Sequence, residues 1–247
     1  MGRVTNPKRF IEEWGRATLR DPFQHVEKRT PRLCPICDYA GLFTSMYLRG
    51  RREARCPNCA SLERHRQFML ILKERNIDLG AAHVIHFAPE RVFLKKYHAA
   101  PNYVFGDIYP KPRYGKRLRK LDISAIDFPD ERFDYLIAFD VMEHVVDHLS
   151  AFAEIARVLK PGGQAFLTVP MIYALKKTYT PPADMPQSRK DLICGGDHKR
   201  LYGRDFPDFL RAVGLEVEEY CSDPEDTLRF ALMYNIVFIA TKRARGG

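Results

Sequence analysis

The segment from Phe133 to Pro170, FDYLIAFDVMEHVVDHLSAFAEIARVLKPGGQAFLTVP, constrains the fold more than any other part of the chain. Its apolar run from Leu136 to Phe139 suits a strand that is covered on both faces. Apolar residues then recur at helical spacing, at Leu149, Phe152, Ile155, Ala156 and Leu159. A Pro-Gly-Gly turn and a second apolar run follow. This order predicts a strand, a helix and a second strand of an α/β sheet.

Three polar residues, Asp140, Glu143 and His144, follow the first of these strands. In open α/β sheets, ligands bind at the carboxyl ends of the strands. We therefore expect this cluster to lie at a ligand site. For His144, a structural role in the turn competes with a catalytic one.

The alternation of strands and helices continues through the C-terminal two thirds of the chain. Seven strands are predicted, near residues 83–87, 103–105, 120–121, 135–139, 164–169, 216–220 and 235–240. Helices between the first five predict a doubly wound, Rossmann-like, mostly parallel sheet. Residues 176–190 have the composition of a long loop, which in a compact domain often closes over a ligand.

Two motifs, FDYLIAFDVMEHV at 133–145 and RVLKPGGQAFLTVP at 157–170, resemble the later motifs of class I methyltransferases that use S-adenosylmethionine. The resemblance spans about residues 81–241. Together with HFAPE, CPNCASLERHR and GGDHKRLYGRDF, these motifs are similar to a bacterial, type 11-like methyltransferase group that carries a zinc ribbon before the catalytic domain. The resemblance implies S-adenosylmethionine as cofactor. It also implies that the last strand is reversed and inserted beside its neighbour.

The resemblance places the methionine end of the cofactor at the HFAPE turn, with His86, Phe87, Ala88 and Glu90 as binding residues. The family usually has a glycine-rich turn here. Ala88 is small, and Pro89 suits the first position of a helix. Glu90 in the first helical turn could pair with the cofactor's ammonium group, or serve only to start the helix.

Further cofactor residues follow the next strands. Asp107, with Ile108, is placed to accept hydrogen bonds from the ribose hydroxyls, although a turn role is an alternative. Asp122 and Ile123 match the adenine position, with an N-cap role as the rival for Asp122. The last two of these residues are Asp140 and Val141, where Asp140 would face the sulfonium and the methyl acceptor.

The GGDHKRLYGRD segment at residues 195–205 supplies further candidate catalytic residues. Methyl transfer depends mainly on in-line positioning, but a hydroxyl acceptor must also lose a proton. His198 has a suitable ordinary pKa for that task, Asp197 could orient it, and His144 is the third candidate. The alternative is a surface turn that closes over the sheet edge.

Four cysteines predict a zinc ribbon. Cys34 and Cys37 form one C-x-x-C pair, Cys56 and Cys59 form another, and eighteen residues separate the pairs. This spacing is typical of a four-thiolate zinc site, which is structural because no coordination position stays open. Free thiols or disulfides are the less favoured alternative. A hairpin with its turn at Gly50 is expected between the pairs.

The chain of 247 residues is 45% hydrophobic, enough for one good core and a small module. We expect a helical segment at 1–30, with an amphipathic helix at 8–19, the ribbon at 31–60, a linking helix at 61–80 and the methyltransferase domain at 81–247. The sequence has neither an apolar run long enough to span a membrane nor an apolar core typical of a signal peptide. A cytoplasmic protein without membrane contact is therefore expected.

The net charge of +9 comes mostly from residues 1–80, which hold 16 Lys and Arg against 9 Asp and Glu. We expect methyl transfer to oxygen or nitrogen of a small molecule, a sugar or glycan intermediate, or a natural product. In one alternative, RNA is the acceptor and the basic ribbon docks it. In another, the fold is retained in a non-catalytic binding protein. A homodimer is a further option for the assembly.

Overall fold

The computed structural model describes residues 30–46, 51–110, 117–232 and 236–244. The expected helix at 8–19 lies outside these ranges. Two compact units are present: residues 1–77 with 221–235, and residues 78–220 with 236–247. Within the described ranges, no helix has the length and apolar character needed to cross a bilayer.

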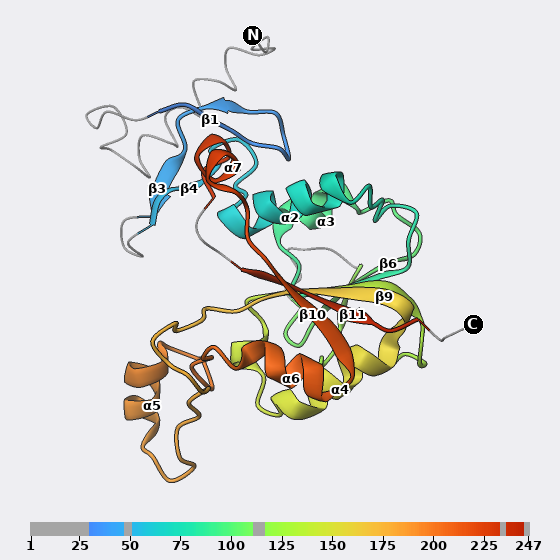
Figure 1. Ribbon diagram of the computed structural model, residues 1–247, viewed down its shortest axis with the longest axis vertical. Helices are drawn as coiled ribbons and strands as arrows, with labels where there is room; N and C mark the ends of the chain where they lie inside the picture. The colour runs from blue at the N-terminus through green and yellow to red at the C-terminus, as the bar shows by residue number, and fades with distance from the viewer. Residues whose placement is uncertain (1–29, 47–50, 111–116, 233–235, 245–247) are drawn as a thin grey trace. The chain divides into compact units, whose positions relative to one another are not determined.

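A seven-stranded sheet forms the second unit, with α3 on one face and α4 and α6 on the other (Figure 1). Its strands are β5 (Val84–Phe87), β6 (Tyr103–Asp107), β7 (Leu118–Lys120), β8 (Phe133–Phe139), β9 (Leu159–Thr168), β10 (Leu215–Tyr220) and β11 (Val237–Lys242). Its helices are α3 (Arg91–Lys96), α4 (His148–Val158), α5 (Gln187–Cys194) and α6 (Phe206–Ala212), and the 3-10 turn η4 spans Met142–His144. The predicted doubly wound, mostly parallel sheet is confirmed, but the helices expected between its first five strands are found, among the described residues, only from β5 to β6 and from β8 to β9.

The strands follow the order β10-β11-β9-β8-β5-β6-β7. Strand β11 lies between β9 and β10 and runs antiparallel to both, whereas β5 pairs in parallel with β6 and β8. The reversed, inserted last strand is therefore confirmed. Because the chain moves outward from β5 to β7 and then returns to the other side at β8, the carboxyl ends of β5 and β8 form the switch point where such sheets bind ligands.

Strand β8 and helix α4 form the centre of the core, and one apolar residue of α4 lies outside it. Leu136, Ile137 and Ala138 are fully buried, as the continuous apolar run predicts. Helix α4 buries a stripe that includes Ala151 and Ile155. Leu149 is 61% exposed instead, because a position two residues before Ala151 points to the opposite side of the helix.

The predicted Pro-Gly-Gly turn is an irregular start of β9 rather than a separate turn. Phe133 pairs with Leu159 and Tyr135 with Gln164, so the intervening residues bulge out of register. A Cβ at Gly163 would lie 3.1 Å from the carbonyl oxygen of Phe133 and 2.9 Å from that of Lys160. Glycine is required there because the backbone approaches too closely for a side chain.

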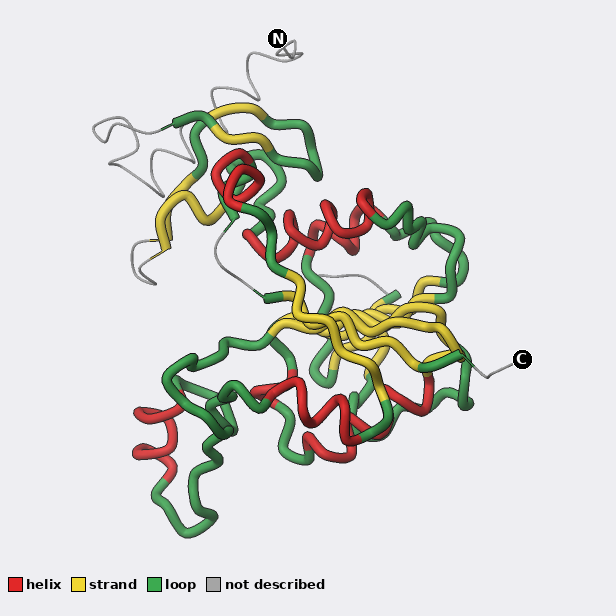
Figure 2. The backbone as a smooth tube through the Cα atoms, in the orientation of Figure 1, coloured by secondary structure: helices red, strands yellow, loops and turns green. Residues whose placement is uncertain are grey.

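The first unit contains two small antiparallel pairs, β1 (Arg32–Leu33) with β2 (Ala40–Gly41) and β3 (Thr44–Met46) with β4 (Arg51–Arg55). The second pair is the predicted hairpin, although Gly50 lies outside the described residues. Helices α2 (Glu63–Glu74) and α7 (Pro224–Arg229) complete the unit, and Figure 2 shows the short strands and these helices by colour.

Helix α2 begins two residues later than the expected start at Ser61. Leu62 is its N-cap, and Nδ1 of His65 accepts a hydrogen bond from the Leu62 N–H at 3.1 Å. An imidazole thus satisfies a backbone group at the helix start. Ser61 is left outside the helix, next to the cysteines.

Arg66 holds residues 230–231 against the ribbon. Its guanidinium is fully buried and donates to the carbonyl oxygens of Ala54 at 3.1 Å, Ser61 at 2.9 Å and Phe230 at 2.8 Å, and also to that of Ala231. The bonds to Phe230 and Ala231 connect parts of the chain that are more than 160 positions apart. No sequence pattern indicated that residues 221–235 belong to this unit.

Candidate functional site

Asp140 lies immediately after β8, in a backbone conformation with φ of 51°. Its carboxylate accepts a hydrogen bond from the Thr168 hydroxyl at 2.9 Å, and its N–H donates to the Thr168 carbonyl at 2.9 Å. These two hydrogen bonds join the end of β8 to the end of β9. The carboxylate predicted to face the sulfonium is held at the switch point of the sheet.

Ala88, directly after β5, takes the conformation that the missing glycine would supply. Its φ is 46°, and its N–H donates to the Gly106 carbonyl at 2.7 Å. Ala88 is exposed, so the backbone at this turn is open to a ligand. The left-handed conformation is unusual for a residue with a Cβ. The absence of the glycine-rich motif therefore does not remove the turn.

Two other residues of the HFAPE turn are buried, and the helix after it begins later than Pro89 would predict. His86 and Phe87 are buried in β5, where Nδ1 of His86 lies 2.9 Å from the Tyr103 hydroxyl. Glu90 is the N-cap of α3, so Pro89 precedes the helix instead of starting it. The Glu90 carboxylate lies 3.7 Å from Nε2 of His86.

Asp107 is the last residue of β6, and one of its carboxylate oxygens accepts the Tyr109 N–H at 2.8 Å. Ile108 and Tyr109 beside it are 45% and 76% exposed. Apolar surface next to a strand-end carboxylate suits a nucleoside, whose ribose is polar and whose base is flat and apolar on its faces. The turn hydrogen bond and a ribose contact are compatible because a carboxylate has several acceptor positions.

Asp122 and Ile123 form a turn after β7. One oxygen of Asp122 accepts both the N–H of Ser124 at 2.8 Å and its hydroxyl at 2.7 Å. Ile123 is 5% exposed and packs in the core. Val141 is partly buried, at the start of η4.

The structure brings the three predicted catalytic residues together. His144 and His198 lie edge to face with ring centroids 4.8 Å apart, and Nδ1 of His144 lies 3.2 Å from the Asp197 carboxylate. Burial lowers the pKa of His144, and the Asp197 carboxylate partly opposes this effect. The imidazole is therefore biased toward its neutral form, which can accept a proton or bind a metal.

Glu143 also belongs to this cluster; the sequence placed it at the ligand edge of the sheet but not among the candidate catalytic residues. It is 1% exposed, and its carboxylate lies 3.9 Å from Nε2 of His144. One ligand atom each from Glu143, His144 and His198 fits within 4.8 Å. The adjacent pair of Glu143 and His144 could have indicated a metal site, but nothing in the sequence placed His198 beside it.

Arg200 fastens the 197–202 segment onto η4. Its buried guanidinium donates to the carbonyl oxygens of Met142 at 3.2 Å and Val146 at 2.8 Å, and also to that of Val145. The Lys199 N–H donates to the Glu143 carbonyl at 2.7 Å. The turn that carries His198 is thus fixed by backbone contacts.

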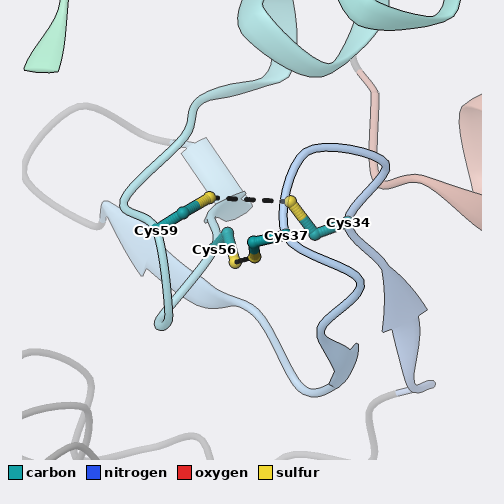
Figure 3. Close-up of side chains that lie close together, drawn as sticks. All are labelled: Cys34, Cys37, Cys56 and Cys59. Carbon is teal, nitrogen blue, oxygen red and sulfur yellow. Dashed lines mark hydrogen bonds between the residues drawn. The ribbon is translucent and has the colours of Figure 1, made fainter. Parts of the chain in front are cut away.

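The four cysteines gather at one point, as the sequence predicted (Figure 3). None of the four is paired in a disulfide; Sγ of Cys34 lies 3.6 Å from that of Cys59, and Sγ of Cys37 lies 3.7 Å from that of Cys56. A tetrahedron with zinc–sulfur bonds of about 2.3 Å has edges of about 3.8 Å. The spacing of the sulfurs therefore fits a four-thiolate metal site.

The two cysteine knuckles repeat each other. In each, the N–H four residues after the first cysteine donates to that cysteine's carbonyl, from Asp38 to Cys34 and from Ala60 to Cys56, at 2.9 Å in both. Asp38 and Ala60 both have positive φ. Hydrogen bonds from Cys37 and the other thiols lower the pKa of Cys34, whereas thiol contacts of the same cluster raise the pKa of Cys37 and of Cys56. Cys34 is therefore the member of the cluster that most favours the thiolate, the form that binds metal.

The sheet order, the reversed strand and the polar switch point define the fold of class I methyltransferases. Residues 78–167 match the family model described as a methyltransferase domain. Over 102 residues, the chain is 26% identical to a protein of Mycolicibacterium smegmatis described as a probable S-adenosylmethionine-dependent methyltransferase. This match covers 41% of the chain and 36% of that relative.

Solved structures of methyltransferases are similar to this chain. A chain of Galdieria sulphuraria described as a sarcosine dimethylglycine methyltransferase aligns with a TM-score of 0.50 at 13% identity, over 77% of this chain and 88% of that one. An S-adenosylmethionine-dependent methyltransferase from Mesorhizobium loti aligns with a TM-score of 0.49 at 16% identity, over 70% of this chain and 96% of that one. At such identities the likeness concerns the fold and not the substrate.

Proposed function

We propose that this protein transfers a methyl group from S-adenosylmethionine to an oxygen or nitrogen of a small molecule, a class that includes sugars, glycan intermediates and natural products. The methyl carbon would leave the sulfonium sulfur as its bond to the acceptor forms. The products are S-adenosylhomocysteine and the methylated acceptor, and a hydroxyl or protonated nitrogen acceptor also loses a proton. In-line alignment of the two substrates supplies most of the rate.

The observation that carries this proposal is the position of two carboxylates and one open turn. Asp107 ends β6, Ala88 follows β5 and Asp140 follows β8, and these three strands are adjacent and parallel. An extended nucleoside along this edge would place its ribose near Asp107 and its sulfonium near Asp140. Glu90 would lie beside the methionine end.

For the acceptor, we propose that the cluster of His144, Asp197 and His198 faces the transferred methyl group. Asp140 and His144 lie on the same turn after β8, because the 3-10 turn that ends at His144 begins two residues after Asp140. An imidazole near the sulfonium could bind the acceptor or take its proton.

A small-molecule acceptor is favoured over RNA because two arginines of the first unit are neutralised internally. Nε and Nη2 of Arg51 donate to the two oxygens of the Glu63 carboxylate, and Arg32 bonds Glu53 at 2.9 Å. A surface built to bind phosphates keeps such charges available. We further propose that the four cysteines hold a structural zinc ion.

Calorimetry with S-adenosylmethionine and zinc-loaded full-length protein tests the cofactor assignment, with micromolar binding expected and no binding contradicting it. Methyl incorporation from labelled cofactor into a fractionated cell extract tests the acceptor class. Label in a small-molecule fraction supports the proposal. Label in RNA that is lost steeply with added salt would establish the RNA alternative. Cofactor binding without any labelled product would favour a non-catalytic binding protein.

A further inference from the structure

We propose that Glu143, His144 and His198 form a second metal site, separate from the cysteine cluster, which binds one divalent transition-metal ion beside the methyl acceptor. Its role toward the acceptor rests on the proposed methyl transfer. Its ability to bind metal does not, and can be measured independently.

The donor atoms of the three residues lie close together. One carboxylate oxygen and two imidazole nitrogens can be chosen that all lie within 4.8 Å of one another. Ions such as Zn²⁺, Co²⁺ and Mn²⁺ bind nitrogen at about 2.0–2.1 Å and carboxylate oxygen at about 2.0–2.2 Å. Donors at this separation need only small side-chain movements to reach a common ion.

The two ring nitrogens of His144 face two different carboxylates. Its Nδ1 faces the Asp197 carboxylate at 3.2 Å, while its Nε2 faces the Glu143 carboxylate at 3.9 Å. A proton carried on Nδ1, on the side of the Asp197 carboxylate, leaves Nε2 with the lone pair that a metal requires. Metal-binding histidines commonly have this arrangement, in which a carboxylate holds the other ring nitrogen. Asp197 is therefore assigned as an orienting residue rather than a ligand.

The turn that carries Glu143 and His144 is fastened to the segment that carries His198. Glu143 is 1% exposed, and its carbonyl accepts the Lys199 N–H at 2.7 Å. Arg200 binds the carbonyl oxygens of Met142 and Val146, which flank the two ligands of the turn. The two chain segments are thus fastened to each other by contacts that do not involve the side chains of the metal ligands. A buried carboxylate beside two imidazoles is stabilised by a cation at their centre.

Three protein ligands leave at least one coordination position open, unlike the four-thiolate site. That position could bind an oxygen of the acceptor and lower the pKa of its hydroxyl. In this assignment His198 acts as a ligand, and the hydroxyl proton passes to solvent water. The class of acceptor then narrows to molecules that offer an oxygen for coordination.

The test titrates Co²⁺ into full-length protein that already carries one zinc ion per chain, because thiolates retain zinc strongly. We expect one Co²⁺ to bind per chain, with visible bands but without the near-ultraviolet charge-transfer band of cobalt–thiolate bonds. His198→Ala should weaken Co²⁺ binding at least tenfold, and so should Glu143→Gln. His98→Ala, which removes an exposed histidine of the same unit, should not change it.

Glu143 is buried, so its replacement also tests the fold, whereas His198 is partly exposed and its variant should melt like the wild type. Absence of Co²⁺ binding to the wild type, or equal binding to wild type and His198→Ala, overturns the proposal. Calorimetry with S-adenosylmethionine on the same samples separates the two proposals: Co²⁺ binding without cofactor binding refutes only the proposed function, and cofactor binding without Co²⁺ binding refutes only the metal site.

Discussion

His144 and His198 stand edge to face, 4.8 Å apart between ring centroids, although one follows β8 and the other precedes α6 by several residues. Their proximity depends on Arg200, whose guanidinium joins the two segments through carbonyl oxygens. A cation buried among backbone acceptors is a structural device whose removal leaves several polar groups unsatisfied.

Replacing Arg200 by alanine should therefore destabilise the second unit by about 3 kcal/mol or more, because a buried set of carbonyl groups loses its donor. Urea denaturation followed by circular dichroism measures this change. Arg189→Ala, in an exposed position of α5, is the matched control and should stay within about 0.5 kcal/mol of the wild type. Equal midpoints for the two variants would show that Arg200 is not a structural fastener.

Asp107→Asn should weaken S-adenosylmethionine binding by about tenfold to a hundredfold, because hydrogen bonds to a charged acceptor contribute about 1.5–3 kcal/mol. Asparagine keeps an oxygen for the Tyr109 N–H, so the turn itself should survive. Calorimetry measures the affinity, with Asp208→Asn on the exposed surface of α6 as control. An unchanged dissociation constant for Asp107→Asn would remove this residue from the cofactor site.

Position 88 offers a test of backbone geometry. Ala88→Val should lower the free energy of unfolding by about 1–2 kcal/mol, because a β-branched residue fits poorly at positive φ. It should also weaken cofactor binding, since its bulk stands on the open turn. Ala88→Gly should preserve both properties. If thermal melts and calorimetry fail to separate the valine and glycine variants, the turn does not need its left-handed conformation.

Cys59→Ser should abolish tight zinc binding and unfold the ribbon, because structural zinc contributes about 10 kcal/mol or more to the folding of such modules. Zinc content is measured by mass spectrometry, and hydrogen exchange reports each unit separately. Faster exchange is expected in residues 30–77, with little change in residues 78–220. Cys221→Ser, at an exposed cysteine of the same unit, is the control. Full zinc content in the Cys59 variant would refute the four-thiolate site.

His148 should make the second unit sensitive to acid. Burial, together with the nearby Arg200 charge, lowers the pKa of His148 to about 4, below the ordinary 6.5 expected in the unfolded chain. The unfolded chain therefore binds a proton first, so this contribution to stability is complete above pH 6.5 and is lost as the pH falls toward 4. Because the ring is partly exposed, we expect a loss of about 1–2 kcal/mol.

The acid effect is measured by urea denaturation between pH 7 and 4. Nδ1 of His148 lies 2.9 Å from the Tyr202 hydroxyl, and His148→Asn keeps a polar group near that position. The asparagine variant should lose less stability than the wild type over this range. A parallel decline of both proteins would assign the acid sensitivity to other groups.

Local patterns were sufficient to predict much of this structure. The apolar run at 136–139 predicted a buried strand, because a strand covered on both faces has no polar side, and the fully buried Leu136 bears this out. The cysteine spacing predicted the cluster, since each C-x-x-C pair forms its knuckle within a few residues. The place of the reversed strand β11 came from the resemblance to methyltransferases, because spacing along a chain carries no information on strand order.

Other features depended on contacts between distant residues. Residues 230–231 join the first unit through Arg66, and His198 joins His144 through Arg200, over separations that no local periodicity encodes. Ala88 adopts positive φ because its N–H is bound to the neighbouring strand at Gly106, against its own conformational preference. Short-range chemistry thus decided the elements and the metal-binding pairs, whereas tertiary hydrogen bonds decided which functional side chains meet, because those bonds form only after the sheet has brought its strand ends together.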